Sequence, residues 1–141
     1  MMPTRRSFIK KGCVHCAAII GAGFLLEGCG SSMHMYKTQV SDKKIIVPLN
    51  EFPADKNIMV VRSKDMENDI LLVKKNDHYN ALYLQCTHEG VGLSATDKKI
   101  VCTAHGSVFD FDGNVLKEPA LKPLKKFETS VIENNLIISL T

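Results

Sequence analysis

Short apolar runs separated by polar turns make up the chain from residue 45 to its end. The runs are rich in Val, Ile, Leu, Tyr and Phe, the residue types that favour strands. No segment of this part repeats its apolar positions with a helical period for long enough to predict a helix. The pattern therefore predicts nine strands, at residues 45–49, 57–62, 69–75, 78–85, 99–102, 107–111, 115–117, 127–133 and 136–140.

Three pairs of turn-forming residues fall between these predicted strands. They are Asn76-Asp77, Asp112-Gly113 and Asn134-Asn135, and each pairing tolerates the positive φ angles of tight hairpin turns. Hairpins of this kind join antiparallel strands. Strands this short, spaced about every ten residues, are typical of a sandwich or a small barrel. We therefore predict an all-β fold built from antiparallel sheets.

The first 28 residues have a different pattern, that of an export signal. A basic start with Arg5 and Arg6 precedes an apolar run at residues 13–26, which ends at Glu27 and the small residue Gly28. The run has 14 residues, whereas a helix needs about 20 to cross a bilayer; a membrane anchor is nevertheless the alternative. The stretch TRRSFIK at residues 4–10 resembles the twin-arginine motif, which implies export of a folded protein.

Residues 26–29, with the sequence Leu-Glu-Gly-Cys, follow directly. They resemble the lipobox at which bacterial lipoproteins are cleaved and acylated on the cysteine, with Glu27 as a departure from the usual small or apolar residue. Lipid on Cys29 would attach the protein to a membrane surface, and an uncleaved or simply secreted chain is the alternative. Residues 29–44 are rich in small and polar types, so they are predicted to form a flexible tether ahead of the domain at residues 45–141.

The charge is unevenly distributed along the chain. The formal net charge is +3, and the segment before residue 29 accounts for all of it, because acidic and basic residues balance over residues 29–141. A nucleic-acid partner needs a clustered positive face that can release counterions. The predicted domain therefore has no charge pattern for binding nucleic acid.

Two of the five cysteines remain after the predicted signal and acylation site are set aside. Cys86 and His88 directly follow the predicted strand at residues 78–85; Cys102 ends the predicted strand at residues 99–102, and His105 follows it. Each loop thus supplies one sulfur and one imidazole to a common centre. Glycines at positions 90, 92 and 106 let the backbone approach that centre. A disulfide or a structural zinc site would also use such residues, although zinc fingers usually take two cysteines from one loop.

The two loops resemble the signature CxH…CxxHG of the Rieske family, through Cys86, His88, Cys102, His105 and Gly106. The resemblance implies one [2Fe–2S] cluster per chain, with Cys86 and Cys102 on one iron and His88 and His105 on the other. It also implies a small sandwich or barrel with a two-loop cluster-binding subdomain. Ser107 matches a residue that donates a hydrogen bond to a bridging sulfide. The later stretch Glu118-Pro119-Ala120 resembles the proline-containing loop that covers the cluster.

The sequence departs from the quinol-oxidising members of that family at three positions. Val91 and Ala104 stand where those members have a disulfide between the two loops, and Phe109 stands where they have tyrosine. Fewer hydrogen bonds to the sulfurs stabilise the reduced cluster less, so we expect an intermediate reduction potential. Glu89 follows a predicted ligand directly and is either the nearest exposed charge to the imidazoles or an ordinary loop carboxylate.

These expectations favour one-electron transfer at the bacterial cell envelope, with the protein attached to the periplasmic or outer side of a membrane. The predicted partners are the membrane, through lipid on Cys29, and redox proteins: a quinol-linked donor in a respiratory chain, and a cytochrome or oxidoreductase subunit as acceptor. No catalytic nucleophile is predicted. The alternatives are a small electron-transfer subunit of an exported oxidase or dehydrogenase, a ferredoxin-like carrier and, least favoured, a structural zinc module.

Overall fold

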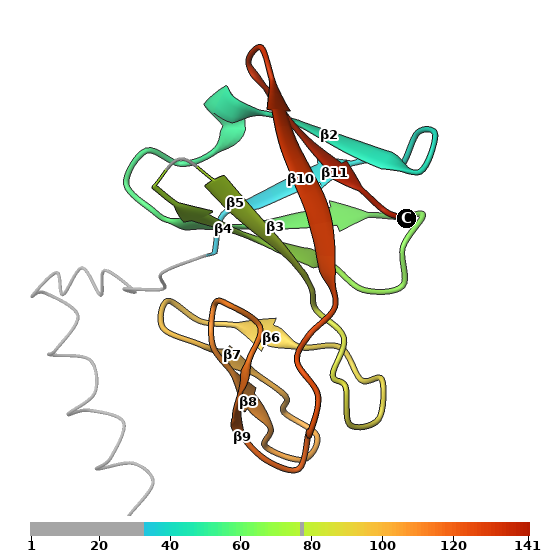
Figure 1. Ribbon diagram of the computed structural model, residues 1–141, viewed down its shortest axis with the longest axis vertical. Helices are drawn as coiled ribbons and strands as arrows, with labels where there is room; N and C mark the ends of the chain where they lie inside the picture. The colour runs from blue at the N-terminus through green and yellow to red at the C-terminus, as the bar shows by residue number, and fades with distance from the viewer. Residues whose placement is uncertain (1–32, 77) are drawn as a thin grey trace, which may run out of the picture. The chain divides into compact units, whose positions relative to one another are not determined.

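The computed structural model describes residues 33–76 and 78–141, drawn in colour in Figure 1. The predicted signal segment and Cys29 lie outside the described residues. In the described ranges the chain forms strands in two sheets and one short 3-10 helix, η1 (Leu49–Glu51). None of the described helices is long and apolar enough to span a bilayer.

The larger sheet has seven strands and bends until its two ends meet. Its strand order is β1 (Met35–Thr38), β3 (Ile58–Ser63), β4 (Ile70–Lys75), β5 (His78–Tyr83), β10 (Lys126–Ile132), β11 (Asn135–Ser139) and β2 (Lys44–Pro48). The two terminal strands, β1 and β2, lie against each other, so the sheet is close to a barrel. All neighbours are antiparallel except β1 and β3, which pair in parallel.

The smaller sheet is an insertion between β5 and β10. It has four very short strands in sequence order, β6 (Ser94–Ala95), β7 (Ile100–Val101), β8 (Val108–Phe109) and β9 (Val115–Lys117). In Figure 1 these strands and their long connecting loops lie below the seven-stranded sheet. We call residues 84–125 the insert. It contains every candidate ligand that the sequence predicts.

Strands β3 and β4 are buried on both faces over most of their length, which explains the nearly continuous apolar runs in their sequences, and β5 is buried on both faces at Ala81 and Leu82. Alternate residues point to the interior of the larger sheet, where Met59, Ile70 and Leu72 pack. The intervening residues point to the insert, where Leu71 and Leu82 pack in the same cluster as Phe109. The insert therefore shares a hydrophobic core with the sheet that supports it.

Polar contacts also join the insert to the larger sheet. The Lys75 ammonium lies 2.5 Å from Oδ1 of Asp112, and the amide of Asn80 donates to the same oxygen at 3.1 Å and to the Phe111 carbonyl at 3.2 Å. The hydrogen bond from Lys75 lowers the pKa of Asp112, even though partial burial acts in the opposite direction. These contacts connect the β8–β9 turn to strands β4 and β5.

The all-β prediction is confirmed, and the nine predicted strands appear close to their expected positions. The structure adds β1 and β6. The expectation of purely antiparallel sheets is wrong for β1, because it pairs in parallel with β3 through contacts such as the hydrogen bond from the Val60 N–H to the His34 carbonyl, at 2.9 Å. The turn expected at Asn134-Asn135 lies one residue earlier, since Glu133 has the positive φ of 55°.

Part of the segment predicted as a flexible tether, residues 29–44, is folded in the described chain. Residues 35–38 form β1, residues 41 and 44 form a bridge, and Val40 donates its N–H to Asp65 at 2.9 Å. The described chain is therefore part of the folded domain from β1 onward. Strand β1 was not predicted because residues 35–44 have little apolar periodicity. A strand at the edge of a sheet can be held mainly by backbone hydrogen bonds, which need no such pattern.

Candidate metal centre

Two loops of the insert have the same backbone geometry. We call residues 86–91 loop A and residues 102–107 loop B. In loop A the Cys86 N–H donates to the Val91 carbonyl at 2.7 Å, and the Gly90 N–H donates to the Cys86 carbonyl at 2.8 Å. In loop B the corresponding bonds run from Cys102 to Ser107 at 2.8 Å and from Gly106 to Cys102 at 3.0 Å. Each cysteine is thus anchored through both of its backbone polar groups.

A glycine closes each of these loops at the fourth position after the cysteine. Gly90 has φ +74° and Gly106 has φ +80°, in the left-handed region that other L residues rarely adopt. This conformation turns the chain back sharply enough for both hydrogen bonds to form. The spacing of cysteine and glycine in the sequence is therefore what makes loops A and B equivalent.

The two cysteine sulfurs converge in the interior of the insert. Cys86 and Cys102 are 2% and 1% exposed, and both are free thiols. Burial raises the pKa of the Cys102 thiol, but hydrogen bonds from the backbone of His105 and Ala104 and from the Cys86 side chain together bring the pKa below its ordinary value. The site therefore stabilises a thiolate, the form of cysteine that binds metal.

The two histidines lie on the solvent side of the sulfurs. The rings of His88 and His105 are edge to face with their centroids 5.3 Å apart, and their side chains are 34% and 45% exposed. Sulfur and nitrogen donors are thus separated: sulfur inside, imidazole outside. One cysteine and one histidine from each loop match the two-sulfur, two-nitrogen donor set of a Rieske cluster.

A carboxylate lies between the two imidazoles. Oε1 of Glu89 is 3.6 Å from Nε2 of His88, and Oε2 is 3.6 Å from Nδ1 of His105. The three side chains form a compact exposed group at the surface of the insert. Of the two possibilities that the sequence left for Glu89, this geometry favours an exposed charge near the imidazoles over an ordinary loop carboxylate.

The segment at residues 118–122, which we call the strap, holds both loops through hydrogen bonds. The Ala120 N–H donates to Oγ of the fully buried Ser107 at 3.0 Å, and Oγ1 of Thr87 donates to the Lys122 carbonyl at 2.6 Å. The peptide bond between Glu118 and Pro119 is cis. Because Ser107 accepts from the strap, its hydroxyl proton remains available for an acceptor inside the site.

The role of Thr87 was not predicted from the sequence. It stands between two predicted ligands, and its partner in the strap is 35 residues further along the chain. A hydroxyl-bearing residue within a ligand motif was the available signal, but nothing local identifies the distant carbonyl that accepts its proton. The structure thus shows loops A and B, which lack a connecting disulfide, both bonded to the same strap.

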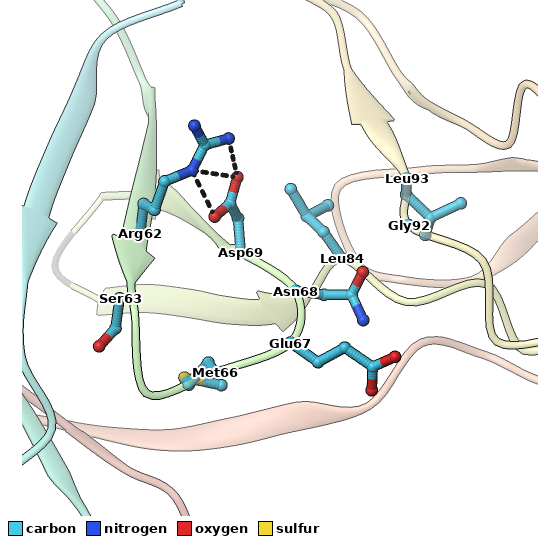
Figure 2. Close-up of a pocket in the computed structure, with 9 residues that line it drawn as sticks. All are labelled: Arg62, Ser63, Met66, Glu67, Asn68, Asp69, Leu84, Gly92 and Leu93. Carbon is cyan, nitrogen blue, oxygen red and sulfur yellow. Dashed lines mark hydrogen bonds and ion pairs between the residues drawn. The ribbon is translucent and has the colours of Figure 1, made fainter.

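A pocket of about 380 Å³ lies outside this group of side chains, between the β3–β4 connection and the residues that follow loop A (Figure 2). Arg62 binds Asp69 there, with Nε 2.9 Å from Oδ1 and Nη2 2.6 Å from Oδ2. The amide nitrogen of Asn68 is buried without a hydrogen-bond partner among the described residues. No cysteine or histidine lines this pocket, so it is separate from the predicted metal centre.

Comparison with known proteins identifies the family to which this fold and this pair of loops belong. The Rieske [2Fe-2S] domain matches residues 35–128, well over half of the 141-residue chain, so the chain belongs to the Rieske family. Membership implies one [2Fe–2S] cluster, as the sequence predicted.

Curated relatives match over about half of the chain. Cytochrome b6-f complex iron-sulfur subunit 3 of Nostoc sp. PCC 7120 is 35% identical over 77 residues, which are 52% of this chain and 43% of that protein. The cytochrome b6-f complex iron-sulfur subunit of Chlorobaculum thiosulfatiphilum is 28% identical over 75 residues, 52% of this chain and 41% of that protein. The chain spans less than half the length of these relatives.

Solved structures support the fold. The plasma membrane Rieske protein PetC3 from Synechocystis PCC 6803 has a TM-score of 0.50 and 26% identity, covering 59% of this chain and 86% of that protein. The quaternary ammonium Rieske monooxygenase CntA has a TM-score of 0.56 at 18% identity, covering 70% of this chain and 33% of that protein. At 18% identity the second likeness concerns the fold alone.

Proposed function

We propose that this protein carries single electrons through a [2Fe–2S] cluster held by Cys86, His88, Cys102 and His105. The observation that carries the proposal is the convergence of two buried sulfurs and two half-exposed imidazoles from two loops of the same geometry. When bound, the cluster supplies a one-electron couple. The described residues contribute the buried sulfur ligands, the backbone donors to sulfur, and the imidazole edges at the surface.

The buried side and the solvent-facing side of the site have different roles in this proposal. Phe109 and Leu84, which are 0% and 4% exposed, pack in the same core cluster as the cysteines and keep water from the sulfurs. The imidazoles face solvent, where a redox partner can approach. Electron transfer in and out then takes the shortest route, through the histidine edges. Ser107, buried at the other side, donates its hydroxyl proton towards the cluster in this proposal.

The proposal is tested by metal analysis and spectroscopy of the purified protein. Two irons and two acid-labile sulfides per chain, with a rhombic EPR signal after reduction, are expected. The variants Cys102→Ala and His88→Ala should lack both the visible absorbance and the EPR signal, whereas His78→Ala, which removes an exposed histidine outside the loops, should keep them. Zinc without labile sulfide in the wild-type protein would contradict the proposal.

We further propose that the electron donor is linked to quinol in a membrane-bound respiratory chain, and that the acceptor is a cytochrome or oxidoreductase subunit. The curated relatives support this, because they are iron-sulfur subunits of cytochrome b6-f complexes.

A ferredoxin-like carrier, or a small subunit of an exported oxidase or dehydrogenase, is the second candidate. The observation that favours it is the absence of a disulfide between loops A and B, whose matching positions are Val91 and Ala104. The two candidates are distinguished by adding a quinol to the purified protein and monitoring reduction through the visible spectrum. Reduction supports a quinol-linked donor, and its absence supports the second candidate.

For location, we propose export by the twin-arginine route and acylation of Cys29, which would attach the domain to the outer side of a membrane. The motif at residues 4–10 and the lipobox at residues 26–29 support this. The wild type should label with a palmitate analogue and Cys29→Ser should not. Replacing Arg5 and Arg6 by lysines should leave cluster-loaded precursor in the cytoplasm. Equal labelling of wild type and Cys29→Ser would contradict acylation of Cys29. Normal export of the lysine variant would contradict the twin-arginine route.

A further inference from the structure

Glu89 is the acidic residue that contacts the exposed side of the site. Its two carboxylate oxygens each lie 3.6 Å from a ring nitrogen, one on His88 and one on His105. A single side chain thus contacts imidazoles from both loops. The carboxylate is 56% exposed, so it lies at the surface through which electrons would enter and leave.

The position of Glu89 follows from the backbone of loop A. It stands between His88 and Gly90, whose N–H is bonded to the Cys86 carbonyl at 2.8 Å and whose φ is +74°. The turn therefore directs the side chain at position 89 towards loop B. Of the ion pairs found among residues 33–76 and 78–141, those of Arg62 and Lys75 involve other carboxylates, so the imidazoles are the only ion-pair partners of Glu89.

We infer that Glu89 is a positioning residue that lowers the reduction potential of the site through its contact with both imidazoles. This inference rests on the proposed cluster. Reduction adds one electron from an external one-electron donor and breaks no bond, so the site gains one unit of negative charge. A fixed carboxylate beside the ligands disfavours this gain and stabilises the oxidised state. The chain would then need a stronger reductant than the same site without Glu89.

The test is the midpoint potential of the cluster-loaded protein in three variants, measured by voltammetry at pH 7 and low salt. Glu89→Gln removes the charge and keeps the shape. At a fixed applied potential the ratio of reduced to oxidised protein should rise roughly fivefold, which corresponds to a shift of about 40 mV for one electron. Glu89→Asp keeps the charge and should stay close to the wild type. Glu128→Gln removes an equal charge from strand β10 and should leave the potential unchanged.

Salt supplies a second readout, because the carboxylate is exposed and its field is screened by ions. The difference between wild type and Glu89→Gln should shrink as salt is raised, which a purely structural effect would not do. If Glu89→Gln does not hold the cluster, Glu89→Ser takes its place in the same comparison. Equal potentials in wild type and the neutral variant, each with its full visible spectrum, overturn the role of Glu89 alone. A wild-type protein without iron and sulfide overturns the proposed function and this inference together.

Discussion

The seven-stranded sheet and the insert are held together by different means. Strands of the sheet are four to seven residues long, and β3 and β4 bury both of their faces. Strands of the insert are two or three residues long, and most of its chain lies in loops fixed by local hydrogen bonds. The sheet can rely on apolar burial, whereas the insert depends on its loops, its strap and, in our proposal, its metal ligands. The insert is thus the region where stability and function are coupled.

Loss of the metal ligands gives the largest expected difference between the two regions. Cys102→Ala should abolish the cluster and loosen loops A and B, because a bound metal stabilises the loops that hold it. Hydrogen exchange measured by mass spectrometry should show faster exchange within residues 86–125 and retained protection in β3 and β4. Uniformly faster exchange across both regions would show that the sheet, too, depends on the metal centre.

A cavity created inside the sheet should lower the stability of the protein without changing the metal centre. Leu72 is fully buried on the face of β4 that points away from the insert. Leu72→Ala should lower the free energy of unfolding by about 2–5 kcal/mol. The folded variant should keep the visible spectrum and the midpoint potential of the wild type. Chemical denaturation measures the free energy of unfolding and voltammetry the midpoint potential. A displaced potential would indicate that a cavity on the far face of β4 also disturbs the insert.

Removing the Ser107 hydroxyl tests the buried side of the insert. Ser107→Ala leaves the Ala120 N–H without its acceptor and removes the proton that is available to the cluster. We expect a loss of about 1–3 kcal/mol in stability and a midpoint potential lowered by roughly 40 to 130 mV. Glu89→Gln raises the potential, so the two variants should move it in opposite directions. A rise in Ser107→Ala would contradict the donor role of the hydroxyl.

The second contact of the strap should have a smaller effect. Thr87→Val removes the hydroxyl that donates to the Lys122 carbonyl and keeps the branched shape of the side chain. A loss of about 1 kcal/mol is expected, with faster release of the cluster on warming, followed by the decay of visible absorbance. Thr103→Val is the matched control in loop B, because no hydrogen bond of the Thr103 hydroxyl is found among the described residues. Equal decay rates in the two variants would argue against a role for the strap.

The ion pair between Lys75 of the sheet and Asp112 of the insert should have the smallest effect on stability, and this effect should depend on pH. The pKa of Asp112 is lowered by Lys75, so this pair stabilises the folded state above the ordinary pKa of aspartate, about 4, and the contribution is lost as the pH falls through the lowered value. Lys75→Met should therefore be less stable than the wild type at pH 7, and the gap should close in acid. A gap that stays constant down to pH 2 would mean that the pair is not its cause.

The two regions also differ in how well the sequence predicts them. The apolar runs of β3 and β4 identify buried strands directly, and loops A and B were predicted because their cysteines, histidines and glycines are close in sequence. Strand β6, Ser94–Ala95, has no apolar alternation and exists only because it pairs with β7. Contacts such as Lys75 with Asp112 join residues 37 positions apart, and no local pattern encodes them.

The parallel pairing of β1 with β3 limits how far the proposed lipid anchor would let the domain travel. His34 is already hydrogen-bonded to β3, so only the four residues 30–33 lie between Cys29 and the folded chain. Fully extended, the five residue steps from Cys29 to His34 reach roughly 17 Å, whereas a fully extended tether over residues 29–44 would reach about 50 Å. A lipid on Cys29 would therefore hold the domain close to the bilayer. The protein could diffuse in the plane of the membrane, but the domain could not reach a partner far from the membrane surface. Its donor and acceptor would have to meet it within the thin layer of solvent next to the membrane.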